Sequence, residues 1–141
     1  MNREWHYGDY RISTDKSLLD FDMIYNYLSL RSYWAAGRPM DVIRDSVEGS
    51  LVFGMYKGEQ QIGLTRVISD YATFAYVCDV FVLEEFRGQA LGKWMMKVVT
   101  EHPNLQRGWW ILATRDAHGL YEQVGFTPLP EPQKFMQKRK K

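Results

Sequence analysis

Residues 79–92 read DVFVLEEFRGQALG, and this stretch decides the fold class. It starts inside an apolar, β-branched run, Ala75 to Leu83, which is typical of a strand covered on both faces. From Leu91 to about Glu101 the apolar residues recur with the spacing of one helix face. The stretch therefore predicts a buried strand, expected at the centre of a sheet, that turns directly into a helix.

The segments on either side of this join predict a mixed α/β fold. Short strands are expected at residues 10–13, 51–56, 61–68 and 109–114, and helices at 18–33, 40–49 and 116–125. The turn Lys57-Gly58-Glu59 makes the second and third of these strands a β-hairpin. After a proline-containing loop, Phe135 and Met136 are expected to form a last edge strand. The prediction is a mixed, mostly antiparallel sheet with helices on both faces.

Length and composition indicate one globular domain. The chain has 141 residues, of which 45% are hydrophobic and 25% charged, so we expect a single domain over 1–141 with its core at about 8–137. The only cysteine, Cys78, excludes an internal disulfide and a thiolate zinc site, and fits a reducing, cytoplasmic location. No apolar leader opens the sequence and no run approaches a membrane span, so we expect no membrane partner.

The positive charge gathers at the C-terminus. The net charge is only +1, but residues 138–141 are all basic. A tail of this kind can attract RNA, with an affinity that falls steeply with salt. A solvated C-terminus explains it better, because no aromatic residues for base stacking accompany it. We therefore expect no nucleic-acid partner.

The turn between the strand and the helix is suited to an anion. Gly88 and Gly92 remove side chains, so main-chain N–H groups of the first helical turn can approach a phosphate closely, and Arg87 and Lys93 add positive charge. An ordinary strand-to-helix turn explains the same residues. The glycine spacing excludes a Walker loop and a dinucleotide fingerprint.

Residues 87–92 resemble the acyl-CoA-binding motif of the GNAT acetyltransferases, Gln/Arg-x-x-Gly-x-Gly/Ala. Ala90 stands where the motif has glycine, and we expect its methyl group to hold the backbone slightly away from the pyrophosphate. Residues 117–126, AHGLYEQVGF, are similar to a second motif of that family, A-x-x-L-Y-x-x-x-G-F. The two motifs occur in the family's order, and the order of elements resembles the family over nearly the whole chain.

The resemblance implies an acetyltransferase that binds acetyl-CoA and uses no metal. Main-chain N–H groups of 88–92 are expected to hold the pyrophosphate, and the main chain of Phe81 and Val82 the pantetheine arm, with the Val82 N–H polarising the thioester carbonyl. Thr114 stands where the family often has asparagine. The implied coenzyme-binding residues are Phe81, Val82, Arg87, Gly88, Gln89, Ala90, Leu91, Gly92, Lys93, Thr114 and Tyr121.

Two catalytic roles follow. Tyr121 matches the family's proton donor to the leaving thiolate, although its ring could simply pack beside its neighbours. Asp79 is the preferred general base, because a carboxylate inside an apolar strand must be paired or have a task. The alternatives for the base are Glu84, Glu85 and His118; Tyr76 stands where some relatives carry a glutamate base.

The expected reaction is direct acetyl transfer to a primary amine of a small molecule or peptide. The sequence leaves open a small-molecule amine, an antibiotic, an amino acid or a protein terminus as acceptor. The alternative function is a non-catalytic acyl-CoA sensor. Members of the family commonly form homodimers, and the sequence leaves the oligomeric state of this chain open.

Overall fold

A computed structural model describes residues 1–140 and places six strands in one sheet, in the order in which they occur in the chain. All neighbouring strands pair antiparallel except β5 and β6, which are parallel. The strands are β1 (Glu4–Tyr7), β2 (Tyr10–Ser13), β3 (Leu51–Lys57), β4 (Gln60–Ser69), β5 (Phe74–Val82) and β6 (Trp109–Leu112). The predicted mixed, mostly antiparallel sheet is confirmed, with β5 one place in from the edge instead of at the centre.

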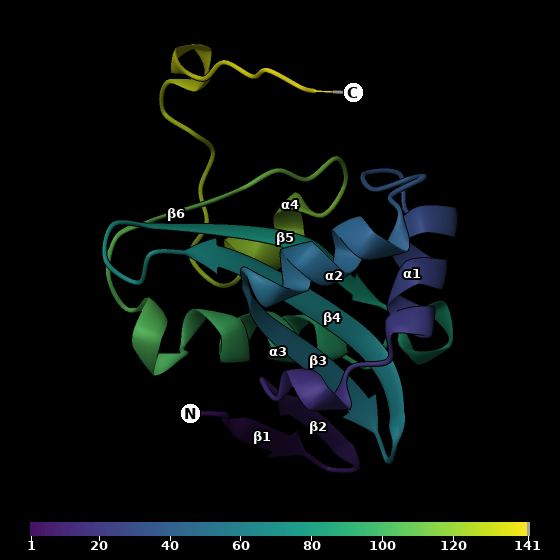
Figure 1. Cartoon of the computed structure of the whole chain (residues 1–141). Coiled ribbons are helices and arrows are strands. Elements are labelled where there is room, and N and C mark those ends of the chain that lie inside the picture. The colour runs from purple at the N-terminus through teal and green to yellow at the C-terminus, as the bar shows by residue number, and fades with distance from the viewer. Residues whose placement is uncertain (141) are drawn as a thin grey trace.

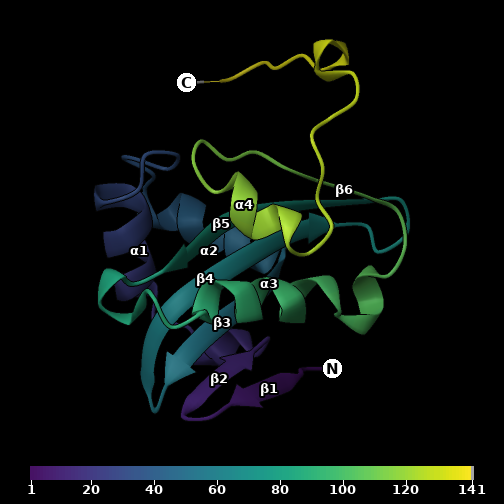
Figure 2. The same cartoon turned by 180° about the vertical axis from the view of Figure 1, so that it is seen from behind.

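Helices cover both faces of this sheet, as predicted. Helices α1 (Phe21–Leu30) and α2 (Met40–Glu48) lie on one face, and α3 (Leu91–Thr100) and α4 (His118–Glu122) on the other (Figures 1 and 2). Single 3-10 turns occur at Lys16–Leu18, Glu84–Phe86, Pro103–Leu105 and Pro132–Lys134. Within residues 1–140, no helix combines the length and the apolar character that a bilayer crossing needs.

The helix boundaries follow from local capping. The helix expected over 18–33 is shorter, because the Asp20 side chain accepts a hydrogen bond from the Met23 N–H and so starts α1 at Phe21. The helix expected over 116–125 forms only at 118–122, and Gly125 ends the following turn with a φ of 99°. The interior of the fold is apolar, with Ile24 and Met95 fully buried on opposite faces of the sheet.

The structure differs from the prediction at both ends of the chain, where one predicted strand is absent and one strand was not predicted. No strand forms at Phe135 and Met136; the chain from residue 127 loops out from the sheet (Figures 1 and 2), with the Phe135 ring 5.6 Å from the Trp109 ring between centroids, and Met136 is 97% exposed. The three prolines of 127–133 explain this, because each lacks the N–H that a strand ladder needs. Conversely, β1 was not predicted, and it pairs with β2 across a tight turn at Gly8.

An irregularity in β5 opens the sheet at one end. Arg66 pairs with Cys78 and Leu64 with Phe81, so two residues of β5, Asp79 and Val80, face one residue of β4. Asp79 takes a left-handed φ of 51° there. The parallel ladder to β6 ends at Val77 and Leu112, so that residues 78–82 have no strand partner on that side.

Candidate active site

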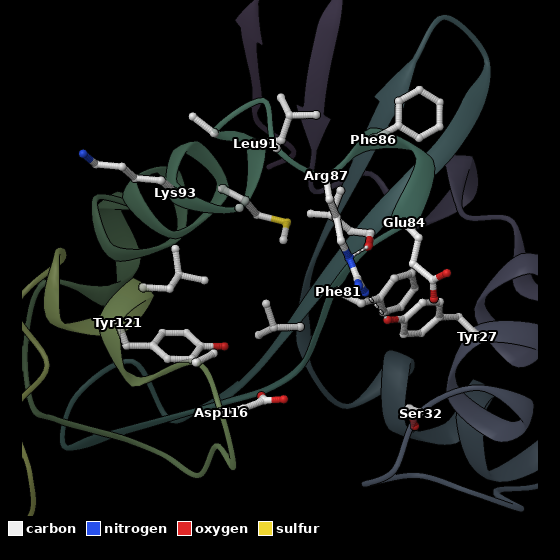
Figure 3. Close-up of a pocket in the computed structure, with 18 of the residues that line it drawn as sticks. Tyr27, Ser32, Phe81, Glu84, Phe86, Arg87, Leu91, Lys93, Asp116 and Tyr121 are labelled. Atoms are coloured by element: carbon white, nitrogen blue, oxygen red, sulfur yellow. Dashed lines mark hydrogen bonds between the residues drawn. The ribbon is translucent and has the colours of Figure 1, made fainter.

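A cleft of about 730 Å³ lies where β5 and β6 separate, and we call it the main cleft. Its walls are the end of β5, the N-terminal turn of α3, the loop after α1, and α4. Figure 3 shows the hydroxyl of Tyr121 pointing into this space from α4, opposite Arg87 and Tyr27. The lining includes Val80, Phe81, Val82, Arg87, Gly88, Ala90, Leu91, Gly92, Lys93 and Tyr121. It thus brings together most of the predicted coenzyme-binding residues.

The N-terminal turn of α3 presents unpaired main-chain donors to the main cleft. No side chain caps this helix, and Leu91, Gly92 and Lys93 all line the cleft. Gly88 has a φ of 81°, and a Cβ added to it would meet no atom within 4 Å, so the space in front of the turn is open. Uncapped N–H groups at a helix start, with the helix dipole behind them, attract anions.

Ala90 departs from the motif in a specific way. It takes a left-handed φ of 61°, a conformation that favours the glycine usually found there. The methyl group therefore introduces backbone strain as well as bulk. Gln89, which was predicted to bind coenzyme, does not line the main cleft, because its side chain accepts a hydrogen bond from the Tyr10 hydroxyl at 2.7 Å.

Arg87 holds two walls of the main cleft together. Its Nε donates to the Val82 carbonyl at 3.1 Å, and its Nη2 donates to the Tyr27 hydroxyl at 2.8 Å. The Tyr27 ring in turn stacks on the Phe81 ring, with 4.0 Å between their centroids. The guanidinium therefore fixes the end of β5 against α1 and keeps a positive charge at the cleft.

The strand register distinguishes Val82 from Phe81. The Leu83 N–H donates to the Ile62 carbonyl on β4, and the Val82 carbonyl accepts from Arg87. Because main-chain groups alternate along a strand, those of Val82 face away from β4 and those of Phe81 face toward it. The register supports the Val82 N–H as the main-chain donor to a bound acyl chain. The main-chain groups of Phe81 face β4, so Phe81 contacts the main cleft through its ring.

Tyr121 is buried and remains protonated. The residue is 8% exposed, and this burial, reinforced by Tyr33 and Asp116, raises the pKa of Tyr121 to about 12. Its ring also packs edge-on against Phe126 at 5.9 Å, which accounts for its fixed orientation. A neutral phenol in a cleft can donate a proton to an anion that forms beside it.

A second cleft of about 600 Å³, the side cleft, meets the main cleft at Tyr121 and Val80. Asp116, Tyr33 and Trp34 also line both clefts. The residues that line only the side cleft are Arg38, Arg66, Tyr76, Val77, Cys78, Asp79, Ala113, Thr114 and Arg139. Tyr121 therefore stands at the junction of two spaces that can hold two different molecules.

Asp79 lies in a buried cluster of ion pairs. Its Oδ2 accepts from Arg38 Nη1 and from Arg66 Nε, each at 2.8 Å, and its Oδ1 accepts from Trp34 Nε1 at 2.9 Å. Only 2% of the side chain is exposed. Three donors already engage the two carboxylate oxygens that would have to take a proton from the amine, which argues against Asp79 as general base. The geometry fits a positioning role instead.

The sequence did not indicate the partners of Asp79. Arg38 and Arg66 were not predicted as functional residues, although a buried aspartate requires partners of this kind. Arg66 pairs with Cys78, the neighbour of Asp79. The pairing of these two strands, β4 and β5, was the only indication that Arg66 lies near Asp79. Asp116 was also missed, because an exposed aspartate in a loop carries no pattern.

The remaining candidates lie in the walls of the two clefts, with Thr114 and Cys78 in the side cleft and Glu84 in the main cleft. Thr114 lines the side cleft instead of the main cleft, and its hydroxyl accepts from the Ala117 N–H at 3.1 Å. Burial raises the pKa of the Cys78 thiol to about 11, so this thiol is a weak nucleophile at neutral pH. Of the alternative bases, Glu84 is exposed and pairs with Arg31 at 3.0 Å. Among residues 1–140, no group of three metal-binding side chains is close enough to hold an ion.

An open-edged strand, an uncapped helix start and a buried phenol thus lie together in one cleft. Comparison with known proteins gives the family. A family model described as an acetyltransferase (GNAT) domain matches residues 48–128. The chain belongs to the GNAT acetyltransferases.

Individual relatives agree with this assignment. A candidate acetyltransferase of Gibberella zeae is 34% identical over 84% of this chain and 79% of its own length. The crystal structure of a candidate GNAT acetyltransferase of Xanthomonas campestris pv. campestris is 46% identical over 92% of both chains, with a TM-score of 0.89. A GNAT acetyltransferase of Elizabethkingia anophelis, solved with acetyl-CoA bound, shares the fold at 16% identity, 86% coverage of this chain, 78% of its own and a TM-score of 0.61.

Proposed function

We propose that the protein transfers the acetyl group of acetyl-CoA directly to a primary amine. The observation that carries this proposal is the position of Tyr121, which lies where the main cleft and the side cleft meet. The main cleft offers anion-binding main-chain groups at one end, and the side cleft offers room for an acceptor. Direct transfer requires both partners beside one proton donor, and this arrangement supplies such a place.

The main cleft suits coenzyme A. Leu91, Gly92 and Lys93, together with Gly88 and Ala90, would hold the pyrophosphate through N–H groups and the α3 dipole. The free edge of β5 would take the pantetheine arm as an added strand, with the Val82 N–H directed toward it. The open space before Gly88 supports this fit, because no side chain obstructs the turn.

The chain's own groups would act on the acyl transfer as follows. Acetyl-CoA supplies the acetyl thioester, whose carbon–sulfur bond breaks as the carbon–nitrogen bond to the amine forms. The Val82 N–H stabilises the negative charge on the carbonyl oxygen, and the Tyr121 hydroxyl gives its proton to the departing sulfur. The ammonium form of the acceptor first loses one proton to solvent, the attacking neutral amine loses one more to water as the amide forms, and Tyr121 regains a proton from solvent.

Burial decides whether Tyr121 can act as this acid. A phenol with a pKa of about 12 is a poor proton donor to a thiolate whose thiol has an ordinary pKa of ~8.5. The proton transfer is uphill by about 5 kcal/mol. A thiolate formed beside Tyr121, away from bulk water, is also more basic than in solution, which narrows this difference.

The test combines binding and turnover on the full chain. We expect acetyl-CoA to raise the melting temperature, and a panel of primary amines to release free thiol from it. Binding of acetyl-CoA with no thiol release for any amine would support the alternative function, an acyl-CoA sensor. Absence of acetyl-CoA binding would contradict both functions.

A further inference from the structure

The charges of the side cleft are unbalanced. Two guanidinium groups, those of Arg38 and Arg66, share the single carboxylate of Asp79. The side chains of Arg38 and Arg66 are only 22% and 11% exposed, so one positive charge is left partly buried. Arg139, from the C-terminal segment, lines the same cleft. An excess positive charge shielded from water is stabilised by an anion beside it.

The two arginines also have donors to spare. Arg38 uses Nη1 for Asp79, and Arg66 uses Nε for Asp79 and Nη1 for the Ser50 hydroxyl at 3.1 Å. In the described chain, residues 1–140, the Nη2 groups of both arginines have no hydrogen-bond partner. Asp79 thus fixes both guanidinium groups while leaving donors at the cleft, and a planar carboxylate matches such donors well.

The end of the side cleft away from Arg38 and Arg66 carries a negative charge. Asp116 lies there beside Tyr121, in the wall that the two clefts share (Figure 3). A carboxylate at that point attracts the ammonium form of an amine and leads it to the place where transfer occurs. The cleft therefore has a negative end at Tyr121 and a positive end at Arg38 and Arg66.

We propose that the acceptor is an amine that also carries a carboxylate, as in an amino acid. This inference rests on the proposed function and names the substrate class of the same site. The amine lies toward Asp116 and Tyr121, and the carboxylate binds Arg38 and Arg66. Trp34 and Tyr76 also line the side cleft, so the body of the acceptor contacts aromatic rings.

The first experiment compares amino acids with the amines that result from removing their carboxylate. The pairs are alanine and ethylamine, histidine and histamine, and tyrosine and tyramine, each assayed by thiol release from acetyl-CoA with the full chain. We expect kcat/KM to be at least about tenfold higher for the better amino acids than for their partner amines, as for one charge-assisted hydrogen bond. Equal or higher kcat/KM for the partner amines, or acetylation of none of the three amino acids, overturns the inference.

The second experiment uses Arg38→Gln, which removes the charge and keeps an amide that can donate to Asp79. We expect kcat/KM for the preferred amino acid to fall at least about tenfold more than kcat/KM for its partner amine. An equal loss for both substrates would mark Arg38 as structural only and overturn the assignment. Arg107→Gln is the control, because Arg107 contacts the Tyr71 carbonyl and lines neither cleft.

The two proposals fail in different ways. If acetyl-CoA does not shift the melting temperature and no amine releases thiol, the acetyltransferase function itself is contradicted. If acetyl-CoA binds and only amines without an anionic group are acetylated, the function stands and the acceptor class is wrong.

Discussion

Arg66 on β4 and Asp79 on β5 are joined at 2.8 Å, Nε to Oδ2, at the point where β5 carries an extra residue. Asp79 holds a left-handed φ of 51° there, a conformation that costs an aspartate on the order of 1 kcal/mol. The hydrogen bonds from Trp34, Arg38 and Arg66 keep it in place. This cluster therefore determines the path of the next residues of β5, which form the edge of the main cleft.

Replacing Asp79 with asparagine tests the positioning role. The substitution leaves two guanidinium groups without a countercharge, and we expect the free energy of unfolding to fall by about 3 kcal/mol. Activity should fall with it, because the edge of β5 shifts, but the pH dependence of kcat should keep its shape. Urea unfolding and a pH–rate profile measure the two effects. Asp45→Asn, at an exposed position of α2, is the matched control. An unchanged stability with loss of the acidic limb of the profile would restore Asp79 as the general base.

Tyr121→Phe removes the proposed proton donor and little else. We expect kcat to fall by about 10²-fold or more, the range for loss of a general acid, with acetyl-CoA affinity nearly unchanged. Thiol release and the thermal shift by acetyl-CoA measure these quantities. Tyr25→Phe serves as the control, since Tyr25 lies on α1 and lines neither cleft. Wild-type turnover in the Tyr121 variant would remove this residue from the mechanism.

The raised pKa of Tyr121 predicts a wide alkaline range of activity. The active form is the neutral phenol, and with a pKa of about 12 it is still about 99% neutral at pH 10, where an ordinary tyrosine is half ionised. We therefore expect kcat to show no decline from Tyr121 ionisation between pH 7 and about pH 10. A fall with a midpoint near pH 10 that is absent from Tyr121→Phe would contradict the raised pKa.

Gly63→Ala tests the link between β4 and the cleft edge. A Cβ at Gly63 would lie 2.8 Å from the Phe81 carbonyl oxygen, so β5 must move away. We expect a loss of about 1–3 kcal/mol in stability and weaker acetyl-CoA binding. Gly49→Ala, where the nearest atom is at 3.7 Å, is the control. A Gly63 variant that binds acetyl-CoA normally would show that the position of this edge is unimportant.

Local patterns predicted most of the fold. The hairpin of β3 and β4, the apolar run of β5 and the helical spacing of α3 depend on neighbouring residues, and all three were recovered. The strand at residues 135–136 was wrong because its two apolar residues had no partner strand to pair with. β1 alternates polar and aromatic residues over only four positions, Glu4 to Tyr7, a run too short to predict a strand by itself, and it owes its place to pairing with β2.

The candidate site was recovered where it depends on one continuous segment. Residues 87–93 and Tyr121 line the main cleft as expected, Gln89 excepted. The Asp79 cluster depends on contacts 13, 41 and 45 residues apart, and on a bulge that shifts the strand register. Such contacts follow from the folded arrangement, so the sequence showed that Asp79 needed partners without identifying them.

The two clefts that meet at Tyr121 have a kinetic consequence under the proposed function. Apart from the shared wall, the main cleft and the side cleft are lined by different residues, so both substrates can be bound at once. The acetyl group can then pass directly to the amine without a covalent acyl-enzyme intermediate. Initial-rate plots against one substrate at fixed levels of the other should intersect instead of running parallel. The enzyme would then work through a ternary complex, and neither product need leave before the second substrate arrives.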